Sequence, residues 1–107
     1  MTKERLKQYR VIGQEREQIR SKIETLEAQH LPALKRYYEG KLTELAQEQL
    51  AIEQAIDSLG PVERMLMRYY YIDGLTWEEV SERICYSWAQ THRLHTAAIE
   101  QIEDQPC

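Results

Sequence analysis

The sequence predicts an all-α protein in two parts, a helical hairpin or coiled coil over residues 1–58 and a three-helix unit over residues 59–107. Apolar residues recur at spacings of three and four along nearly the whole chain, and no segment alternates with period two for long. Residues that break helices are scarce, with four glycines and three prolines among 107 residues. The few breakers divide the chain into its helices.

The first predicted helix covers residues 2–29. Its apolar positions alternate spacings of three and four, the seam pattern of a coiled coil, and Arg16 fills one slot. Gly13 lies inside this helix and costs roughly 1 kcal/mol relative to alanine. The seam consists of Tyr9, Ile12, Ile19, Ile23 and Leu26, and Leu6 extends the same face.

The second predicted helix begins at about Tyr38 or Lys41 and ends at Ser58. We expect residues 30–40 to form a turn or a short helix around Pro32. The apolar positions again follow three-four spacing, with one polar residue among them. This second seam consists of Leu42, Leu45, Gln49, Ile52, Ile56 and Leu59.

Two narrow seams joined by a short connection favour an antiparallel hairpin within one chain, and the alternative is that each seam pairs with a second chain. Because a two-helix hairpin has a thin core, we expect it to pack on the C-terminal part, to form a homodimer, or both. Arg16 and Gln49 either fix the pairing register or lie at the edge of the seam. The residues expected to make the dimer are Ile12, Ile19, Ile23, Leu26, Leu42, Leu45, Ile52 and Ile56.

The C-terminal part begins with a helix at Pro61, a residue that suits the first helical position because its missing N–H would be unpaired there. Asp73-Gly74 ends this helix. In the run of three tyrosines we expect Tyr69 to be buried and the other two to be half-exposed. The inward positions predicted by helical spacing are Val62, Met65, Leu66, Tyr69 and Ile72.

Two capping boxes follow, eleven residues apart. In the first, Thr76 is the N-cap and Glu79 the third residue; in the second, Ser87 and Gln90 take these places. Two helices joined by a tight turn at this spacing predict a helix-turn-helix. Inward residues are expected to be Trp77, Val80 and Ile84 in the first helix, and Thr91, Leu94, Ala98 and Ile102 in the second.

The second helix of such a motif reads DNA with its N-terminal half in the major groove. Arg93 can bind guanine with its two N–H groups, Gln90 can pair with adenine, and His92 and Thr96 can contact bases or phosphates. Trp88 either stacks on the nucleic acid or anchors the helix on Tyr86 or a partner chain. The predicted DNA-binding residues are Ser87, Trp88, Ala89, Gln90, His92, Arg93 and Thr96.

Three stretches of the C-terminal part share a wider pattern: Leu59-Gly60-Pro61-Val62-Glu63-Arg64, the run from Tyr69 to Val80, and Tyr86-Ser87-x-x-Gln90-Thr91-x-Arg93-Leu94-His95-x-Ala97-Ala98-Ile99. Through them residues 57–103 resemble region 4 of sigma-70-type factors, and in particular the small phage and prophage regulators of the ArpU/RinA-like group. Those regulators pair a helical N-terminal segment with a region-4-like helix-turn-helix. The resemblance implies sequence-specific DNA binding and transcription control in phage-infected or lysogenic bacteria, with bacterial RNA polymerase as a second partner.

The chain departs from the family pattern at three positions of the motif. The family usually has alanine, glycine and valine where this chain has Ser81, Cys85 and Thr91. The second departure matters most for the backbone, because glycine adopts positive φ without strain and cysteine does not.

Charge is the larger departure. Residues 61–107 contain four arginines and eight acidic residues, so this part carries the whole net charge of −4. DNA binding requires cations near phosphates. We therefore expect a single chain to bind DNA weakly, and a dimer that reads two half-sites ~34 Å apart to bind it more tightly. The expected cations are Arg64 and Arg68, or Lys35, Arg36 and Lys41, whereas Lys3, Arg5, Lys7 and Arg10 are expected to form a solvated face.

The acidic balance also leaves a second hypothesis, a phage-type protein-binding module that docks on a host protein such as RNA polymerase or a defence nuclease. An enzyme is not expected, since the sequence has no glycine-rich phosphate loop and no nucleophile elbow. We expect no metal or other cofactor. The sequence has no apolar run of membrane-spanning length and no signal-peptide core, so we expect a cytoplasmic protein of a bacterial cell.

Overall fold

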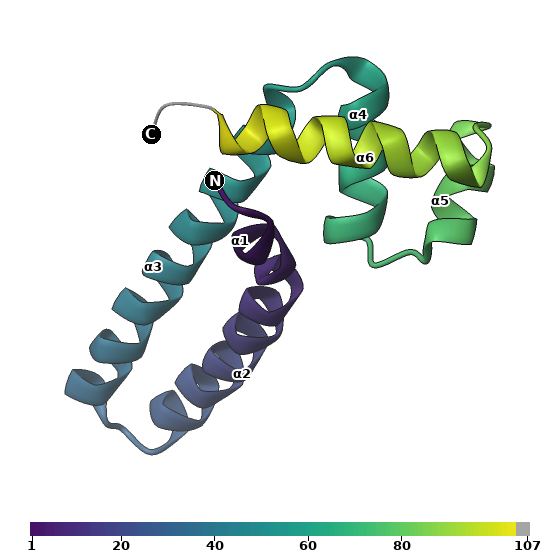
Figure 1. Cartoon of the computed structure of the whole chain (residues 1–107). Coiled ribbons are helices and arrows are strands. Elements are labelled where there is room, and N and C mark those ends of the chain that lie inside the picture. Colours follow the sequence, from purple (N-terminus) through teal and green to yellow (C-terminus); the bar gives the residue numbers. More distant parts are fainter. Residues whose placement is uncertain (105–107) are drawn as a thin grey trace.

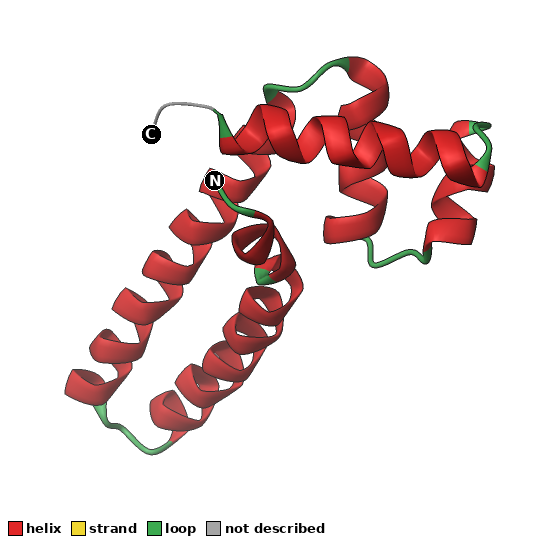
Figure 2. Cartoon of the chain, viewed as in Figure 1, coloured by secondary structure: helices red, strands yellow, loops and turns green. Residues whose placement is uncertain are grey.

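The computed structural model describes residues 1–104, so residues 105–107 of the predicted second part lie outside the described residues. The described residues form helices joined by short loops and contain no strand, which confirms the all-α prediction (Figure 2). A long hairpin projects from the helix-turn-helix unit, and the molecule measures 55 × 31 × 19 Å (Figure 1). Within residues 1–104 no helix has both the length and the apolar content needed to cross a membrane.

The two long helices of the hairpin, α2 (Tyr9–Ala28) and α3 (Pro32–Asp57), lie side by side and antiparallel in one chain (Figure 1). Their seams therefore face each other, as the hairpin prediction requires. Of the eight predicted dimer residues, Ile12, Ile19, Leu26, Ile52 and Ile56 are buried within this chain, and Ile23, Leu42 and Leu45 are half-buried. A homodimer stays a prediction, and in this conformation it must use other surfaces.

The two helices of the hairpin both begin at other residues than predicted. The first predicted helix is broken at Gln8, whose N–H bonds to the Arg5 carbonyl, so that a separate helix α1 (Lys3–Lys7) precedes α2. Residues 30–40, predicted as a turn or a short helix, mostly belong to one long helix, because α3 begins at Pro32 and not at Tyr38 or Lys41. Proline's fixed φ suits the first helical turn, so Pro32 starts the helix and does not interrupt it.

A polar contact spans the hairpin where the seams carry Arg16 and Gln49. The Arg16 guanidinium donates to the Gln49 side-chain oxygen, and the Gln49 amide donates to the Tyr9 carbonyl at 3.2 Å. Gly13 lies under this amide, since a Cβ there would be 3.2 Å from Gln49 Nε2. The two polar residues thus bond to each other at one register of the hairpin, as the register hypothesis expects.

The helix-turn-helix unit contains α4 (Pro61–Met67), a π-helical segment (Arg68–Ile72), α5 (Trp77–Ile84) and α6 (Trp88–Glu103). The π-helical segment explains why one burial prediction is wrong. Tyr71 is buried and Tyr69 is half-buried, the reverse of the expected order. A π-helix has more residues per turn than an α-helix, so the inward position moves along the sequence. In α4, which precedes this segment, Leu66 is buried as predicted, but Met67 is buried in place of Met65, which is 45% exposed.

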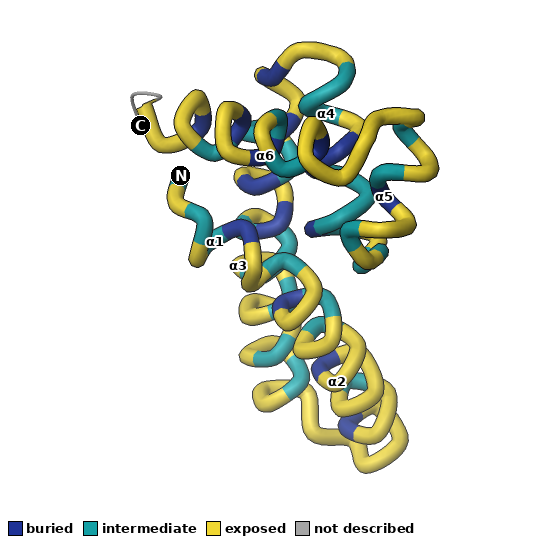
Figure 3. The backbone as a smooth tube through the Cα atoms, turned by 45° about the vertical axis from the view of Figure 1, so that its right-hand side comes forward, coloured by how far each residue is buried: buried dark blue, intermediate teal, exposed yellow. Residues whose placement is uncertain are grey.

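One core joins the two parts of the chain. Leu6 and Ile12 from the hairpin belong to the same cluster as Leu66, Tyr71 and Val80 of the helix-turn-helix unit. The buried residues are concentrated where the parts meet and are sparse toward the hairpin turn (Figure 3). The division at residue 58 stays a prediction, but the core runs across it.

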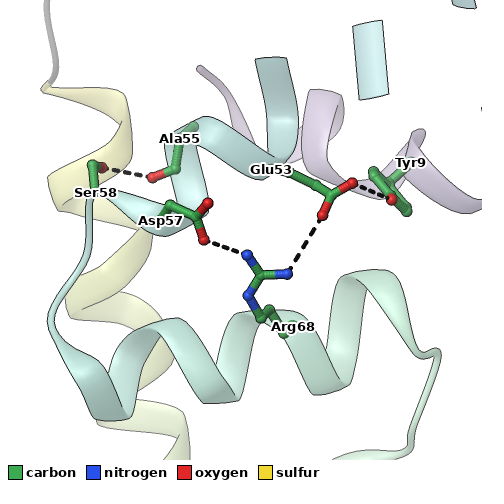
Figure 4. Close-up of polar contacts among 6 residues, drawn as sticks. All are labelled: Tyr9, Glu53, Ala55, Asp57, Ser58 and Arg68. Atoms are coloured by element: carbon green, nitrogen blue, oxygen red, sulfur yellow. Dashed lines mark hydrogen bonds and ion pairs between the residues drawn. The ribbon is translucent and has the colours of Figure 1, made fainter. Parts of the chain in front are cut away.

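Arg68 fixes the junction from the polar side. Its guanidinium pairs with Asp57 and, at 3.4 Å, with Glu53 of α3, and Glu53 also accepts a 2.8 Å hydrogen bond from the Tyr9 hydroxyl (Figure 4). Burial and this bond to Glu53 raise the pKa of Tyr9 to about 12. One network thus links α2, α3 and the π-helical segment, and it removes Arg68 from the cations free to contact DNA.

Candidate nucleic-acid interface

Both predicted capping boxes are present and set the directions of α5 and α6. The Thr76 hydroxyl accepts from the Glu79 N–H at 3.2 Å, and the Glu79 carboxylate accepts from the Thr76 N–H at 3.1 Å. At the start of α6, Ser87 and Gln90 make the equivalent bonds at 3.2 and 3.3 Å. Each box satisfies N–H groups that would otherwise lack partners, which fixes where the helix begins.

The turn between the helices passes through Cys85 in the left-handed conformation, with φ 62° and ψ 35°. The N–H groups of Cys85 and Tyr86 both bond to the Ser81 carbonyl, which ends α5 in one residue. This geometry normally selects glycine. The chain therefore forms the sharp turn of the motif despite the cysteine, at a cost of about 1 kcal/mol in backbone strain.

The other two departures from the family pattern compensate each other. The Ser81 hydroxyl donates to the Thr91 hydroxyl at 3.0 Å, which in turn donates to the Ser87 carbonyl at 2.8 Å. Thr91 is fully buried, so an unpaired hydroxyl there would be costly. A hydrogen bond between α5 and α6 thus replaces the apolar contact that alanine and valine would make.

The predicted DNA-binding residues lie on the exposed N-terminal half of α6, with one exception. Ser87, Trp88, Ala89, Gln90, Arg93 and Thr96 are exposed, and His92 is half-buried. The Trp88 side chain is 57% exposed and its ring lies 3.9 Å from the His92 ring, between centroids. Arg93 has no ion-pair partner among the described residues, so its guanidinium is free for an external acceptor.

The Gln90 side chain is less available for a contact with adenine than the sequence indicates. Its side-chain oxygen accepts from both the N–H and the hydroxyl of Ser87. A bidentate contact with adenine uses that same oxygen, so it requires the capping bonds to be shared or lost. Arg93 therefore remains the leading candidate for a base contact.

An aromatic cluster lies behind the N-terminal half of α6. The Trp77 ring stacks on Tyr70 with centroids 3.9 Å apart and contacts His92 and His95 at 4.8 and 4.6 Å. His95, which we did not predict to be buried, is 8% exposed and bonds through Nε2 to the Tyr71 hydroxyl at 2.7 Å. Burial, followed by the charges of Lys3, His92 and Lys7, lowers the pKa of His95 to about 4.

Four of the five cations that we expected near this surface are paired or remote from it. Arg68 is paired with carboxylates, and Lys35, Arg36 and Lys41 belong to the half of α3 next to the hairpin turn, remote from α6, where Lys35 pairs with Glu27 and Glu39 (Figure 1). Lys3 and Lys7 of α1 instead line a cavity of about 210 Å³ together with Tyr70, Tyr71, Trp77, His92 and His95. No local signal reveals this position, because it depends on α1 folding back onto the aromatic cluster.

A separate open groove on α6 is lined by Tyr86, Gln90, Arg93 and Leu94. Tyr86 is 40% exposed, so the start of α6 presents aromatic rings as well as hydrogen-bonding groups. Residues 1–104 contain no group of three His, Cys, Asp or Glu side chains arranged to hold a metal ion. The exposed groups at the start of α6 can form hydrogen bonds, stack on other rings and contribute positive charge.

The comparisons with known proteins agree with this geometry in one respect. The chain is 40% identical over 55 residues to the RNA polymerase sigma-G factor of Bacillus subtilis (strain 168). The match covers 51% of this chain and 21% of the sigma factor, so the chain spans about a fifth of the length of this relative. No family model matches, and no solved structure matches. About half of the chain is therefore similar in sequence to part of a bacterial sigma factor.

Proposed function

We propose that this chain is a sequence-specific DNA-binding regulator of transcription, of the phage or prophage type, that inserts the N-terminal half of α6 into a major groove. The observation that carries the proposal is the second capping box. It starts α6 directly after a sharp turn and leaves Ser87, Trp88, Ala89, Arg93 and Thr96 exposed in the half of the helix that reads DNA in this motif.

The similarity to a sigma factor supports the same function. A sigma factor by its printed name acts with RNA polymerase. We propose double-stranded DNA as the principal partner of this chain and bacterial RNA polymerase as a second one. The 55 matched residues cover 21% of the sigma factor, so the similarity concerns one part of such a factor.

Arg93→Ala tests the proposal. A guanidinium that forks onto a guanine contributes about 1–3 kcal/mol, so the variant should bind its site roughly 5- to 150-fold more weakly and discriminate less at one base pair. Fluorescence anisotropy with a labelled duplex carrying the site measures both effects. Arg36→Ala, an equal charge change on an exposed residue of α3, is the matched control and should leave base preference unchanged.

A second candidate function is favoured by charge. The net charge of −4 in residues 61–107 opposes DNA and suits a protein surface. In this alternative the unit docks on a host protein, RNA polymerase or a defence nuclease, through exposed rings such as Trp88 and Tyr86. Absence of DNA binding at low salt, together with loss of protein binding in Trp88→Ala, would favour it over the DNA-binding proposal.

A further inference from the structure

The N-terminal helix α1 brings basic side chains to the edge of the helix-turn-helix. Lys3 and Lys7 line the cavity next to Trp77 and His92. A second cavity of about 340 Å³ adjoins it, since Lys7, Tyr70 and Tyr71 line both, and adds Arg10 of α2. The two cavities form one surface that runs from His92 of α6 past Thr76, the N-cap of α5.

This surface is basic and its cations are unpaired. Among the described residues that line either cavity, none is acidic. No ion pair within residues 1–104 uses Lys3, Lys7 or Arg10. Two carboxylates lie next to the surface: Glu4 of α1 raises the pKa of Tyr71, and Glu79 accepts hydrogen bonds from Thr76. The linings themselves carry three free cations and no carboxylate, so this edge is more basic than the helix-turn-helix unit as a whole.

The same surface offers further hydrogen-bonding groups. His92 lines the first cavity, and its Nε2 is buried without a hydrogen-bond partner in the described part of the chain. The Arg10 guanidinium lies over Gly74, where a Cβ would come within 2.4 Å of it. Any side chain at residue 74 would therefore displace Arg10 from the edge of the surface.

We propose that Lys3, Lys7 and Arg10 bind backbone phosphates of the DNA whose major groove receives α6. This inference rests on the function proposed above and names the source of its phosphate contacts. A major groove is ~12 Å wide, so the strand beside a bound α6 passes within reach of long side chains next to His92. Contacts of this kind supply affinity and orientation and leave base selection to α6.

The proposal explains how an acidic unit holds a polyanion. Each phosphate neutralised by Lys or Arg releases condensed counterions, and the logarithm of the binding constant then falls with log salt at ~0.9 per contact. The unit itself supplies Arg93 on α6, and α1 with the start of α2 supplies three more cations. The hairpin thereby contributes to DNA binding, because α2 holds α1 beside the helix-turn-helix unit.

The test is the salt dependence of binding to a fluorescein-labelled 30-base-pair duplex of mixed sequence, followed by anisotropy. The variant is Lys3→Gln with Lys7→Gln, which removes two charges and keeps a polar side chain that is one atom shorter. The matched control is Lys22→Gln with Arg36→Gln, two exposed residues with no ion-pair partner among the described residues. Lys22 lies thirteen residues after Tyr9, where α2 begins, a rise of roughly 20 Å along that helix.

We expect the α1 variant to lower the log–log slope by about 1 to 2 and to weaken binding about tenfold per lost contact near 0.1 M salt. The control should keep the wild-type slope. Equal slopes for wild type and both variants would overturn this inference and leave the proposed function intact. No binding by the wild-type chain at low salt would instead overturn the proposed function, and the inference with it.

Inorganic phosphate distinguishes a nucleic-acid site from a site for free anions. Trp77 lines the cavity and Trp88 does not, so their two indole N–H signals in NMR spectra separate local binding from general salt effects. If millimolar phosphate shifts the Trp77 signal only in the presence of both lysines while the DNA slope is unaffected by them, the surface binds free anions and the proposal is wrong. A slope that depends on the lysines supports the proposal.

Discussion

The hairpin and the helix-turn-helix unit are held together in different ways. Between residues 27 and 48, all within the described chain, no residue of the hairpin is buried (Figure 3). The helices of the other part have no such stretch without buried residues, as Leu66, Val80 and Ile102 illustrate. The difference indicates that the helix-turn-helix is the centre of the core and that the hairpin is an arm, which joins this core at one end.

Shortening a core residue of each part gives the largest expected contrast. Leu66→Ala removes a side chain with 0% exposure and should cost about 3 kcal/mol of unfolding free energy, because a cavity remains. Ile23→Ala, at a half-buried position of the hairpin, should cost about 1 kcal/mol. Urea unfolding followed by circular dichroism measures both. Equal losses would contradict the division into a centre and an arm.

The buried histidine makes the stability of the centre depend on pH. Because the folded pKa of His95 is lowered to about 4 from an ordinary 6.5, its contribution is complete above pH 6.5 and is lost as the pH falls toward 4. Between these two pH values the unfolding free energy should fall by roughly 3 kcal/mol more than in a variant without His95.

To isolate the contribution of His95, the unfolding free energies of the wild type and of His95→Gln are measured with urea at pH 7.5 and at pH 4.5. The stability advantage of the wild type should shrink at the lower pH, while carboxylates affect both proteins alike. His30→Gln, an exposed histidine of the hairpin, is the control and should show no such change. An advantage that stays constant between the two pH values would mean that His95 titrates normally.

The smallest expected effect compares the two turns. Each part ends a helix with a non-glycine residue in the left-handed conformation, His30 with φ 57° in the hairpin and Cys85 with φ 62° in the helix-turn-helix. Cys85→Gly and His30→Gly should each raise the unfolding free energy by about 1 kcal/mol, seen as a few degrees in melting temperature.

Alanine at the same positions provides the control, since it keeps the strained backbone. Cys85→Ala also removes the Sγ contact to the Glu82 carbonyl at 3.7 Å and should give no stabilisation. If alanine and glycine stabilise equally, side-chain chemistry and not backbone strain sets the cost of these turns.

Local sequence signals predicted local structure well. Both capping boxes, the helix-turn-helix spacing and the two seams of the hairpin are set by residues within a few positions of one another, and all are present. The start of α3 was missed because Pro32 both breaks and begins helices, and the sequence pattern alone does not choose between these roles.

Features that depend on contacts distant in sequence escaped prediction. Tyr71 is buried in place of Tyr69 because of a π-helical segment that no pattern marks. Lys3 and Lys7 were interpreted as a solvated face, and their place beside His92 follows only once α1 packs on the centre. The availability of Gln90 was overstated, since one side chain served both as a cap and as a base contact.

Selection from a pool of randomised duplexes tests whether α6 reads DNA. Wild-type protein should enrich one recurring site, with binding that weakens linearly in log–log salt plots. Arg93→Ala, carried through the same selection, should lose the preference at one position of that site. Recovery of no common sequence by the wild type, even at low salt, would mean that α6 does not read DNA and would direct the search to protein partners.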